Sequence, residues 1–288
     1  MSGFGYVRDD VVADRPVGRL LAGASWAPRP RHVDLSPLAI LTDQGRTSSC
    51  TGQSAKVLLD VVQAVRALGL ARVQRDEQDQ LRLAADALRS AGAIVPASAL
   101  GLYCAGRLRI TPAGQGFRDE GAHYRAVFEE AQEFGVVAEA DMPFEESAAT
   151  RAPDFDALTG AVLLKASDWS RIDSTASAAL DETDACLAMG HPVGFASPVT
   201  RGFQKAFGDE GAYGGDDSGV VGLHAMSVVG YDLDAAVYLV QNSWGAMWGN
   251  NHVPGVGWAG LGRLWVTRQW FGRAQIFDRT VVHGYVAE

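Results

Sequence analysis

Residues 43–53 have the sequence DQGRTSSCTGQ, which places Gln44 six positions before Cys50. Apolar residues recur at helical spacing from Cys50 onward, so the sequence predicts a helix that begins at this cysteine. Ser48 and Ser49 suit a helix entry, because serine is favoured at helix N-caps. A thiol attacks only as a thiolate, and the start of a helix stabilises that negative charge. The stretch therefore predicts a nucleophilic cysteine preceded by an amide side chain.

Two blocks far downstream supply the partners that a cysteine nucleophile needs. His224 lies in the block LHA over residues 223–225, and Asn242 begins the block NSWGAMWG. A histidine can carry the proton between the thiol and the leaving group, and an asparagine can orient the imidazole through a hydrogen bond. Trp244 would shield that hydrogen bond from water and so strengthen it. The candidate catalytic residues are Cys50, His224, Asn242 and Gln44.

This order of blocks resembles the papain-like cysteine peptidases, whose sequences read Q-x-x-x-x-S-C, then H-A, then N-S-W-G-x-x-W-G. The resemblance implies an α+β fold with a helical left lobe, a β-barrel-like right lobe and the active cleft between them. It also implies that the Gln44 side-chain amide and the Cys50 backbone N–H hold the oxyanion. Thr51 stands where plant and animal papains have tryptophan, and this region is more similar to bacterial-type members that read S-C-T-A-N-A. The function implied is that of an endopeptidase acting through a thioester acyl-enzyme.

The resemblance also predicts the residues that bind substrate. Residues 119–123 match a glycine-containing stretch whose backbone pairs with an extended substrate, and residues 191–196 match a strand beside the main specificity pocket. Small side chains at the pocket walls predict a roomy apolar pocket, although the sequence does not define its far side. The predicted substrate-binding residues are Gly121, Ala122, Ala196, Ala225, Trp244 and Trp248.

The chain is predicted to contain an N-terminal extension, residues 1–32, and a peptidase domain, residues 33–288. Periodicity favours a helical lobe at about 43–150 and a strand-rich lobe at about 151–288. The extension has about 30 residues, too few for the helical inhibitory prodomain of papain zymogens, so we expect no autoinhibition of that kind. The predicted helices are 50–68, 76–91, 98–109 and 123–134, and the predicted strands are 162–164, 193–196, 225–231, 237–240 and 264–266.

Three segments lengthen the chain relative to the family. His224 lies 174 residues after Cys50, whereas the interval is about 130–150 residues in papain-like enzymes. The excess falls around residues 70–118 and 141–185, and a loop containing glycine and proline follows at 250–262. Such insertions could cover the cleft or bind an assembly partner.

The net charge, the apolar runs and the cysteines limit which binding partners and which cellular compartment we expect. The formal net charge of −9 argues against a nucleic-acid partner, because phosphate contacts need clustered lysine and arginine. The sequence shows neither a signal peptide nor an apolar run of about 18 residues, so no membrane partner is expected. The two cysteines besides Cys50, Cys104 and Cys186, are expected to be buried free thiols in a reducing, cytoplasmic location. No histidine has carboxylates or cysteines at metal-ligand spacing, so neither a metal nor a cofactor is predicted.

Two other functions are compatible with these patterns. The same scaffold could hydrolyse a different acyl or amide bond, including bonds in cell walls, because the catalytic residues define the chemistry better than they define the acyl group. Alternatively, the domain could be retained as a structural component of a virion or another assembly. The complete set of four catalytic side chains favours a peptidase acting on peptide or protein substrates.

Overall fold

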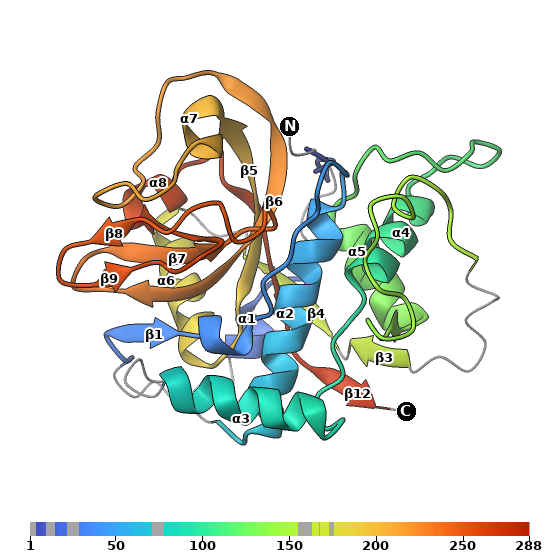
Figure 1. Cartoon of the computed structure of the whole chain (residues 1–288), viewed down its shortest axis with the longest axis horizontal. Coiled ribbons are helices and arrows are strands. Elements are labelled where there is room, and N and C mark those ends of the chain that lie inside the picture. The colour runs from blue at the N-terminus through green and yellow to red at the C-terminus, as the bar shows by residue number, and fades with distance from the viewer. Residues whose placement is uncertain are drawn as a thin grey trace.

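The computed structural model describes residues 4–9, 15–21, 29–70, 78–154, 163–166, 168–172 and 176–287. Most strands gather on one side of the molecule, helices α4 and α5 lie on the other side, and helix α2 runs between them (Figure 1). This arrangement of helices beside an antiparallel sheet is the predicted α+β class.

The helices lie close to their predicted positions. The helices predicted at 50–68, 76–91, 98–109 and 123–134 correspond to α2, α3, α4 and α5, while residues 76 and 77 lie outside the described residues. Among the described residues, three helices, α6, α7 and α8, lie inside the half that was predicted to be rich in strands. The helices are α1 (Gly18–Leu21), η1 (Ser36–Leu38), α2 (Cys50–Ala67), α3 (Gln78–Ser90), α4 (Ala99–Arg109), α5 (Tyr124–Glu133), α6 (Ala176–Ala188), α7 (Arg201–Gln204) and α8 (Arg268–Phe271).

The main sheet has seven strands in the order β10-β7-β6-β5-β11-β4, with β1 also pairing with β6. All of these pairs are antiparallel. Predicted residue 162 lies outside the described residues, and the loop at 250–262 contains the short hairpin β8–β9. The strands are β1 (His32–Asp34), β2 (Val136–Val137), β3 (Leu163–Ala166), β4 (Trp169–Ile172), β5 (Val193–Thr200), β6 (Val220–Asp232), β7 (Val237–Gln241), β8 (His252–Val253), β9 (Gly257–Trp258), β10 (Arg263–Thr267), β11 (Phe277–Val282) and β12 (Tyr285–Ala287).

Helix α2 is buried along most of its length because both lobes pack against it. Its first turn crosses α4 so closely that a side chain at Gly52 would meet the backbone: a Cβ there would lie 2.3 Å from the carbonyl oxygen of Ala99. Glycine permits such a backbone approach. The tight crossing fixes the position of the α2 N-terminus, where Cys50 lies.

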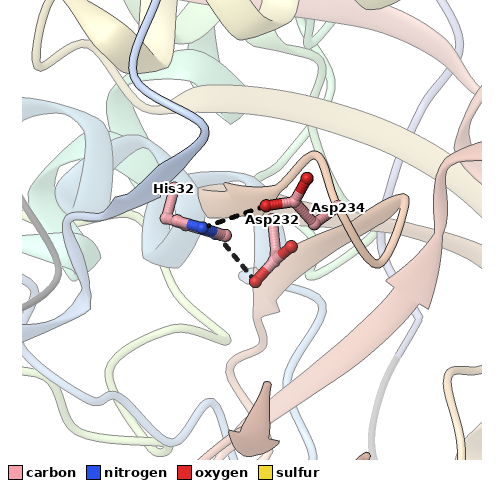
Figure 2. Close-up of side chains that lie close together, drawn as sticks. All are labelled: His32, Asp232 and Asp234. Atoms are coloured by element: carbon pink, nitrogen blue, oxygen red, sulfur yellow. Dashed lines mark ion pairs between the residues drawn. The ribbon is translucent and has the colours of Figure 1, made fainter. Parts of the chain in front are cut away.

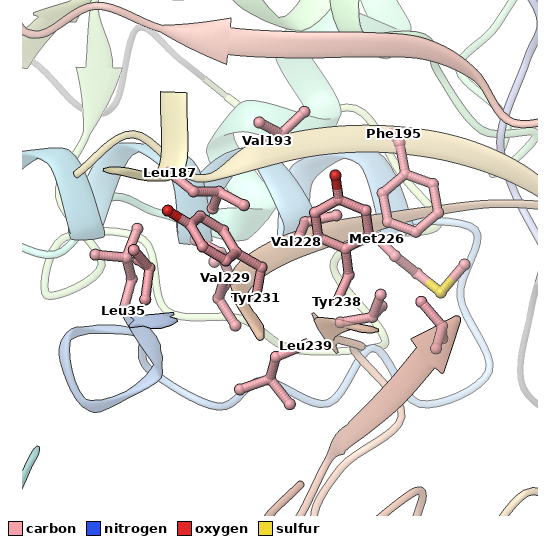
Figure 3. Packing of buried hydrophobic residues seen from close by; sticks show 14 of the residues in the cluster. Leu35, Leu187, Val193, Phe195, Met226, Val228, Val229, Tyr231, Tyr238 and Leu239 are labelled. Atoms are coloured by element: carbon pink, nitrogen blue, oxygen red, sulfur yellow. The ribbon is translucent and has the colours of Figure 1, made fainter. Parts of the chain in front are cut away.

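The core of the strand-rich lobe is formed by apolar side chains of the main sheet and of the helices beside it (Figure 3). Phe195 and Val193 of β5, Met226 and Val228 of β6, and Leu187 of α6 are all buried there. Each such side chain contributes about 1.5–3 kcal/mol on burial. This packing holds β6 in place, and β6 carries His224.

None of the helices among the described residues is long and apolar enough to cross a lipid bilayer.

Candidate active site

The loop before α2 is held by contacts with segments far away in the sequence. The backbone N–H of Gln44 donates to the carbonyl of Ser243 at 2.8 Å, and the Ser243 hydroxyl donates to Oε1 of Gln44 at 2.6 Å. Nε2 of Gln44 donates to the carbonyl of Thr47 at 2.8 Å. The Ser48 N–H donates to the Asp119 carboxylate at 2.9 Å. These bonds orient the Gln44 amide toward the turn that leads into Cys50, the first residue of α2.

The register of the sheet brings His224 and Asn242 together. Strands β6 and β7 are antiparallel with Ser227 opposite Gln241, so the chain after Gln241 runs beside the residues that precede Ser227. Nε2 of His224 lies 2.7 Å from Oδ1 of Asn242. Both side chains are buried. The two residues are 18 positions apart in the sequence, yet they form one hydrogen-bonded pair.

The hydrogen bonds also define which imidazole nitrogen is basic. Oδ1 of Asn242 accepts a second bond, from the backbone N–H of Ser243 at 2.7 Å, which fixes this atom as the amide oxygen. Nε2 of His224 must therefore be the donor, so in the neutral ring the lone pair is on Nδ1. Within the described part of the chain, Nδ1 is buried and has no hydrogen-bond partner. It is the nitrogen that remains to exchange a proton with a nucleophile.

Trp244 contacts His224 directly, whereas Trp248 contacts Trp244. The Trp244 ring stacks on the His224 ring, with centroids 4.6 Å apart and planes at 29°. Trp248 lies behind Trp244, is only 6% exposed, and donates its indole N–H to the Phe203 carbonyl. In this structure Trp248 packs against Trp244, and its role in substrate binding stays a prediction.

Residues 4–9 lie across Cys50, which the sequence did not predict. The Ala122 N–H donates to the Gly5 carbonyl at 3.0 Å, and the Val7 N–H donates to the Ala122 carbonyl at 2.9 Å. The Phe4 ring contacts the rings of both His224 and Trp244 edge-on. Cys50 and His224 are fully buried beneath this segment and its surroundings. The start of the described chain therefore lies over the N-terminal end of α2 (Figure 1).

The predicted substrate-binding residues on both sides of the cleft contact or surround this segment. Gly121 has φ +85°, and a Cβ there would lie 1.6 Å from the Gly5 carbonyl oxygen, so only glycine allows the approach. Ala122 makes the backbone pairing itself. Ala196 and Ala225 are opposite one another in the β5–β6 ladder and belong to the same buried cluster as Cys50. The structure thus brings these four residues together beside the nucleophile.

Burial determines the charge state of the covered pair. It raises the pKa of the Cys50 thiol, an effect that backbone hydrogen bonds from Ala225, Gly5 and Thr51 offset only in part. Burial also lowers the pKa of His224 to about 4, although the bond to Asn242 opposes this shift. Near neutral pH the covered site therefore holds a thiol and an uncharged imidazole. Exposure to water would move both pKa values back toward their ordinary range.

Three residues that shape the site were missed from the sequence. Ser243 holds Gln44, Asp119 holds the turn before Cys50, and Asp278 accepts a hydrogen bond from the Tyr6 hydroxyl at 2.6 Å. Ser243 and Asp119 both lie inside sequence blocks that were already identified. Their hydrogen-bonding side chains could have marked them there as residues that support the site. Asp278 lies in no such block, and only the fold places it near the cleft.

Among the described residues, His32, Asp232 and Asp234 form one group that could surround a cation. Figure 2 shows the imidazole between two carboxylates: Nδ1 lies 2.9 Å from Asp232, and Nε2 lies 3.3 Å from Asp234. A metal takes one imidazole nitrogen and needs its ligands to converge on one point. Here the carboxylates approach different nitrogens, and Arg31 already donates to Asp234. We therefore assign the group to ion pairing that ties β1 to the β6–β7 turn.

Comparison with known proteins agrees with this geometry. The family model described as "Papain family cysteine protease" matches residues 116–254. An uncharacterized peptidase C1-like protein of Acanthamoeba polyphaga mimivirus is 25% identical over 150 residues, which is 46% of this chain and 45% of that protein. The alignment thus spans about half the length of this curated relative.

Solved structures show the same fold over nearly the whole chain. Xylellain, a cysteine protease from Xylella fastidiosa, superposes with a TM-score of 0.67 at 21% identity, covering 98% of this chain and 96% of its own. A procathepsin B from Trypanosoma congolense superposes with a TM-score of 0.63 at 14% identity, covering 99% and 86%. The match to the family model over residues 116–254 and these superpositions together show that the chain has a papain-like fold.

Proposed function

We propose that this chain is a papain-like cysteine endopeptidase that cleaves peptide bonds through a thioester. The observation that carries the proposal is the buried His224–Asn242 pair, in which the basic Nδ1 has no hydrogen-bond partner among the described residues. A domain with a purely structural role would not require the His224 tautomer that keeps the lone pair on Nδ1. Gln44 and the backbone N–H of Cys50 are the proposed oxyanion donors.

The proposed reaction assigns one step to each group. The thiol proton of Cys50 passes to Nδ1 of His224, and the thiolate attacks the carbonyl carbon of the substrate. The oxyanion accepts hydrogen bonds from the Cys50 N–H and the Gln44 amide, at about 3–4 kcal/mol for a donor. His224 then protonates the leaving amine as the C–N bond breaks, which leaves a thioester. A water molecule, deprotonated by His224, hydrolyses the thioester and regenerates the thiol.

An epoxide-type inhibitor of cysteine peptidases tests the proposal directly. We expect one adduct per chain, located on Cys50 by mass spectrometry of the digested protein. Quenched fluorescent peptides should be hydrolysed by the untreated protein and not by the treated protein. Adduct formation without any peptide hydrolysis, together with cleavage of cell-wall fragments, would instead indicate the other amide hydrolase considered above.

Gln44→Ala is predicted to lower kcat by about 10²–10³-fold with little change in KM, because an oxyanion donor acts mainly in the transition state. Gln44 also holds Ser243 and Thr47, so Gln44→Glu is the matched variant: it keeps the shape and the acceptor oxygen but replaces the NH₂ donor. Both variants should lose kcat. A Gln44→Glu enzyme with the wild-type kcat would exclude the donor role.

The segment 4–9 must leave the cleft before a substrate can reach Cys50, because both reacting side chains are fully buried. Tyr6→Ala is predicted to raise the alkylation rate of Cys50 by roughly tenfold or more, since it removes the most buried anchor of the segment. Iodoacetamide labelling followed by peptide mass spectrometry gives the rate. Arg8→Ala, which changes an exposed side chain of the same segment, should label at the wild-type rate.

Cys104 and Cys186 serve as internal references in this experiment. Burial raises the pKa of Cys104 to about 12 and raises that of Cys186 as well, so neither should react at neutral pH. An equal rise in the labelling of all three thiols would mean that Tyr6→Ala loosens the whole protein. In that case the faster alkylation of Cys50 would not show that residues 4–9 shield it.

All three cysteines are free thiols, which supports the further proposal that the protein works in a reducing compartment such as the cytoplasm. The net negative charge supports peptide or protein substrates in place of nucleic acid. The segments around 70–118 and 141–185, which carry α3 and α6, would be the contact surface of any assembly partner.

A further inference from the structure

Tyr6 fills a pocket at the boundary between the two lobes. Its ring packs against Tyr124 of α5 at 5.7 Å and Phe277 of β11 at 5.8 Å between centroids. It belongs to the same buried cluster as Ala196 and Ala225, the predicted pocket walls. The side chain is 6% exposed, so the pocket encloses it almost completely. The apolar walls therefore account for the ring but not for its hydroxyl group.

The hydroxyl group meets a buried carboxylate at the back of the pocket. It donates to Oδ2 of Asp278 at 2.6 Å, while Arg171 donates to Oδ1. Asp278 is 7% exposed and adopts φ +50°, a conformation that few residue types accept readily. Both carboxylate oxygens thus have a donor when a phenol occupies the pocket. Without one, Oδ2 loses the donor that Tyr6 supplies.

A second anchor of the segment shows the charge that surrounds this carboxylate. Asp9 accepts hydrogen bonds from Arg125 at 2.9 Å and from Arg171 at 3.1 Å, and all three side chains are at least 90% buried. When the segment leaves, Asp9 leaves with it. Arg125 also pairs with Glu129 at 3.5 Å, and Arg171 pairs with Asp278, so the Asp278 carboxylate has a guanidinium partner apart from the segment.

We propose that the Tyr6 pocket is the subsite that selects substrates, and that it selects a tyrosine side chain through Asp278. The inference rests on the proposed peptidase function for its catalytic consequence. The segment 4–9 is then an occupant that a substrate replaces, and Tyr6 shows which side chain the pocket fits.

The surroundings of Asp278 distinguish tyrosine from its nearest competitors. Phenylalanine would fill the same apolar walls but would leave Oδ2 without the donor, and a site built to bond a hydroxyl group discriminates strongly against its absence. Lysine would bring its ammonium group to a carboxylate that the Arg171 guanidinium already neutralises. A neutral donor on a flat ring satisfies both conditions.

Paired substrates test the proposal on the full-length protein. Quenched fluorescent peptides that differ only in tyrosine, phenylalanine or lysine at one position, scanned along the peptide, give the ratio of kcat/KM values. We expect tyrosine to exceed phenylalanine by about 10- to 100-fold at one position, and to exceed lysine there too. Equal rates for tyrosine and phenylalanine at every position, or a preference for lysine, would overturn the proposal.

Variants at Asp278 show whether this residue causes the preference. Asp278→Gly and Asp278→Asn both accept the positive φ, so neither should strain the backbone. Asp278→Gly should bring the tyrosine-to-phenylalanine ratio close to one, and Asp278→Asn, which keeps an acceptor oxygen without the charge, should give an intermediate ratio. A wild-type ratio in Asp278→Gly would assign the selection to another residue and overturn the proposal.

A binding experiment separates the pocket from the chemistry. In a full-length Cys50→Ala, Tyr6→Ala protein, a fluorescent peptide with the sequence of residues 4–9 should bind about tenfold more tightly than the same peptide with phenylalanine for tyrosine. If this difference appears although no peptide is hydrolysed by the wild type, the proposed function fails and the pocket assignment stands. If peptides are hydrolysed but neither assay distinguishes the two side chains, the function stands and the pocket assignment fails.

Discussion

Cys50→Ala is expected to abolish peptide hydrolysis while the protein stays folded. Cys50 is the thiol at the start of α2, whereas Cys104 lies within α4 and Cys186 within α6. Removing a nucleophile that acts together with its base costs roughly 10⁶-fold in related acyl-transfer chemistry. Alanine is accommodated at the first turn of a helix and removes little packing, so the unfolding temperature should change by only a few degrees.

Progress curves with a fluorescent peptide and a thermal unfolding scan of the same preparation measure the two effects. Cys104→Ala and Cys186→Ala are the matched controls, because each removes a buried thiol of the same size from a helix. Both controls should retain kcat/KM within a few-fold if they remain folded. Hydrolysis that survives Cys50→Ala at more than about one per cent of the wild-type rate would move the nucleophile elsewhere in the chain.

The pairing of the catalytic blocks was predictable because chemistry constrains each block on its own. A cysteine, a histidine and an asparagine in this order predicted an acyl-transfer site, and the structure brings His224 and Asn242 within 2.7 Å of each other. The helical periodicity after Cys50 predicted α2 almost to its last residue. Local patterns sufficed here because a helix start and a strand end are determined mainly by neighbouring residues.

The contacts of the N-terminal segment were not predictable, because they join residues with no relation in the sequence. Tyr6 and Asp278 are separated by 272 positions, and their bond depends on how β11 lies beside β5. The positive φ of Asp278 has no signature in a non-glycine residue. Nothing in residues 4–9 distinguishes a segment bound in a cleft from an ordinary extension.

Trp248 and α6 show a second limit of the sequence. A tryptophan at this position has the same sequence pattern whether its ring is exposed or buried, and only the structure shows that Trp248 is buried against Trp244. Helix α6 has a buried side that contributes Cys186 and Leu187 to the sheet core, yet short β-rich runs surround it in the sequence. The short apolar runs after residue 150 therefore predicted the sheet correctly, but they gave no sign of the helix that packs on it.

His224→Ala is expected to reduce kcat/KM by roughly 10⁴-fold or more, and Asn242→Ala by about 10²-fold. His224 moves the proton in both half-reactions, and no second histidine lies in a catalytic block. Asn242 moves no proton: it accepts from Nε2 and so keeps the lone pair on Nδ1. Without it the ring would still reach the productive tautomer and orientation part of the time, so turnover would fall without ceasing.

Trp244→Ala should resemble Asn242→Ala, because the stacked indole covers the face of the imidazole and keeps water from the hydrogen bond. The expected order of kcat/KM is therefore wild type, then the Asn242 and Trp244 variants, then the His224 variant. Trp248→Phe is the control for packing in this layer, since Trp248 contacts Trp244 but not the reacting atoms. If Asn242→Ala is folded and as inactive as His224→Ala, the amide does more than orient the ring. If Asn242→Ala keeps the wild-type rate, the imidazole must be oriented by the strand and by Trp244 alone.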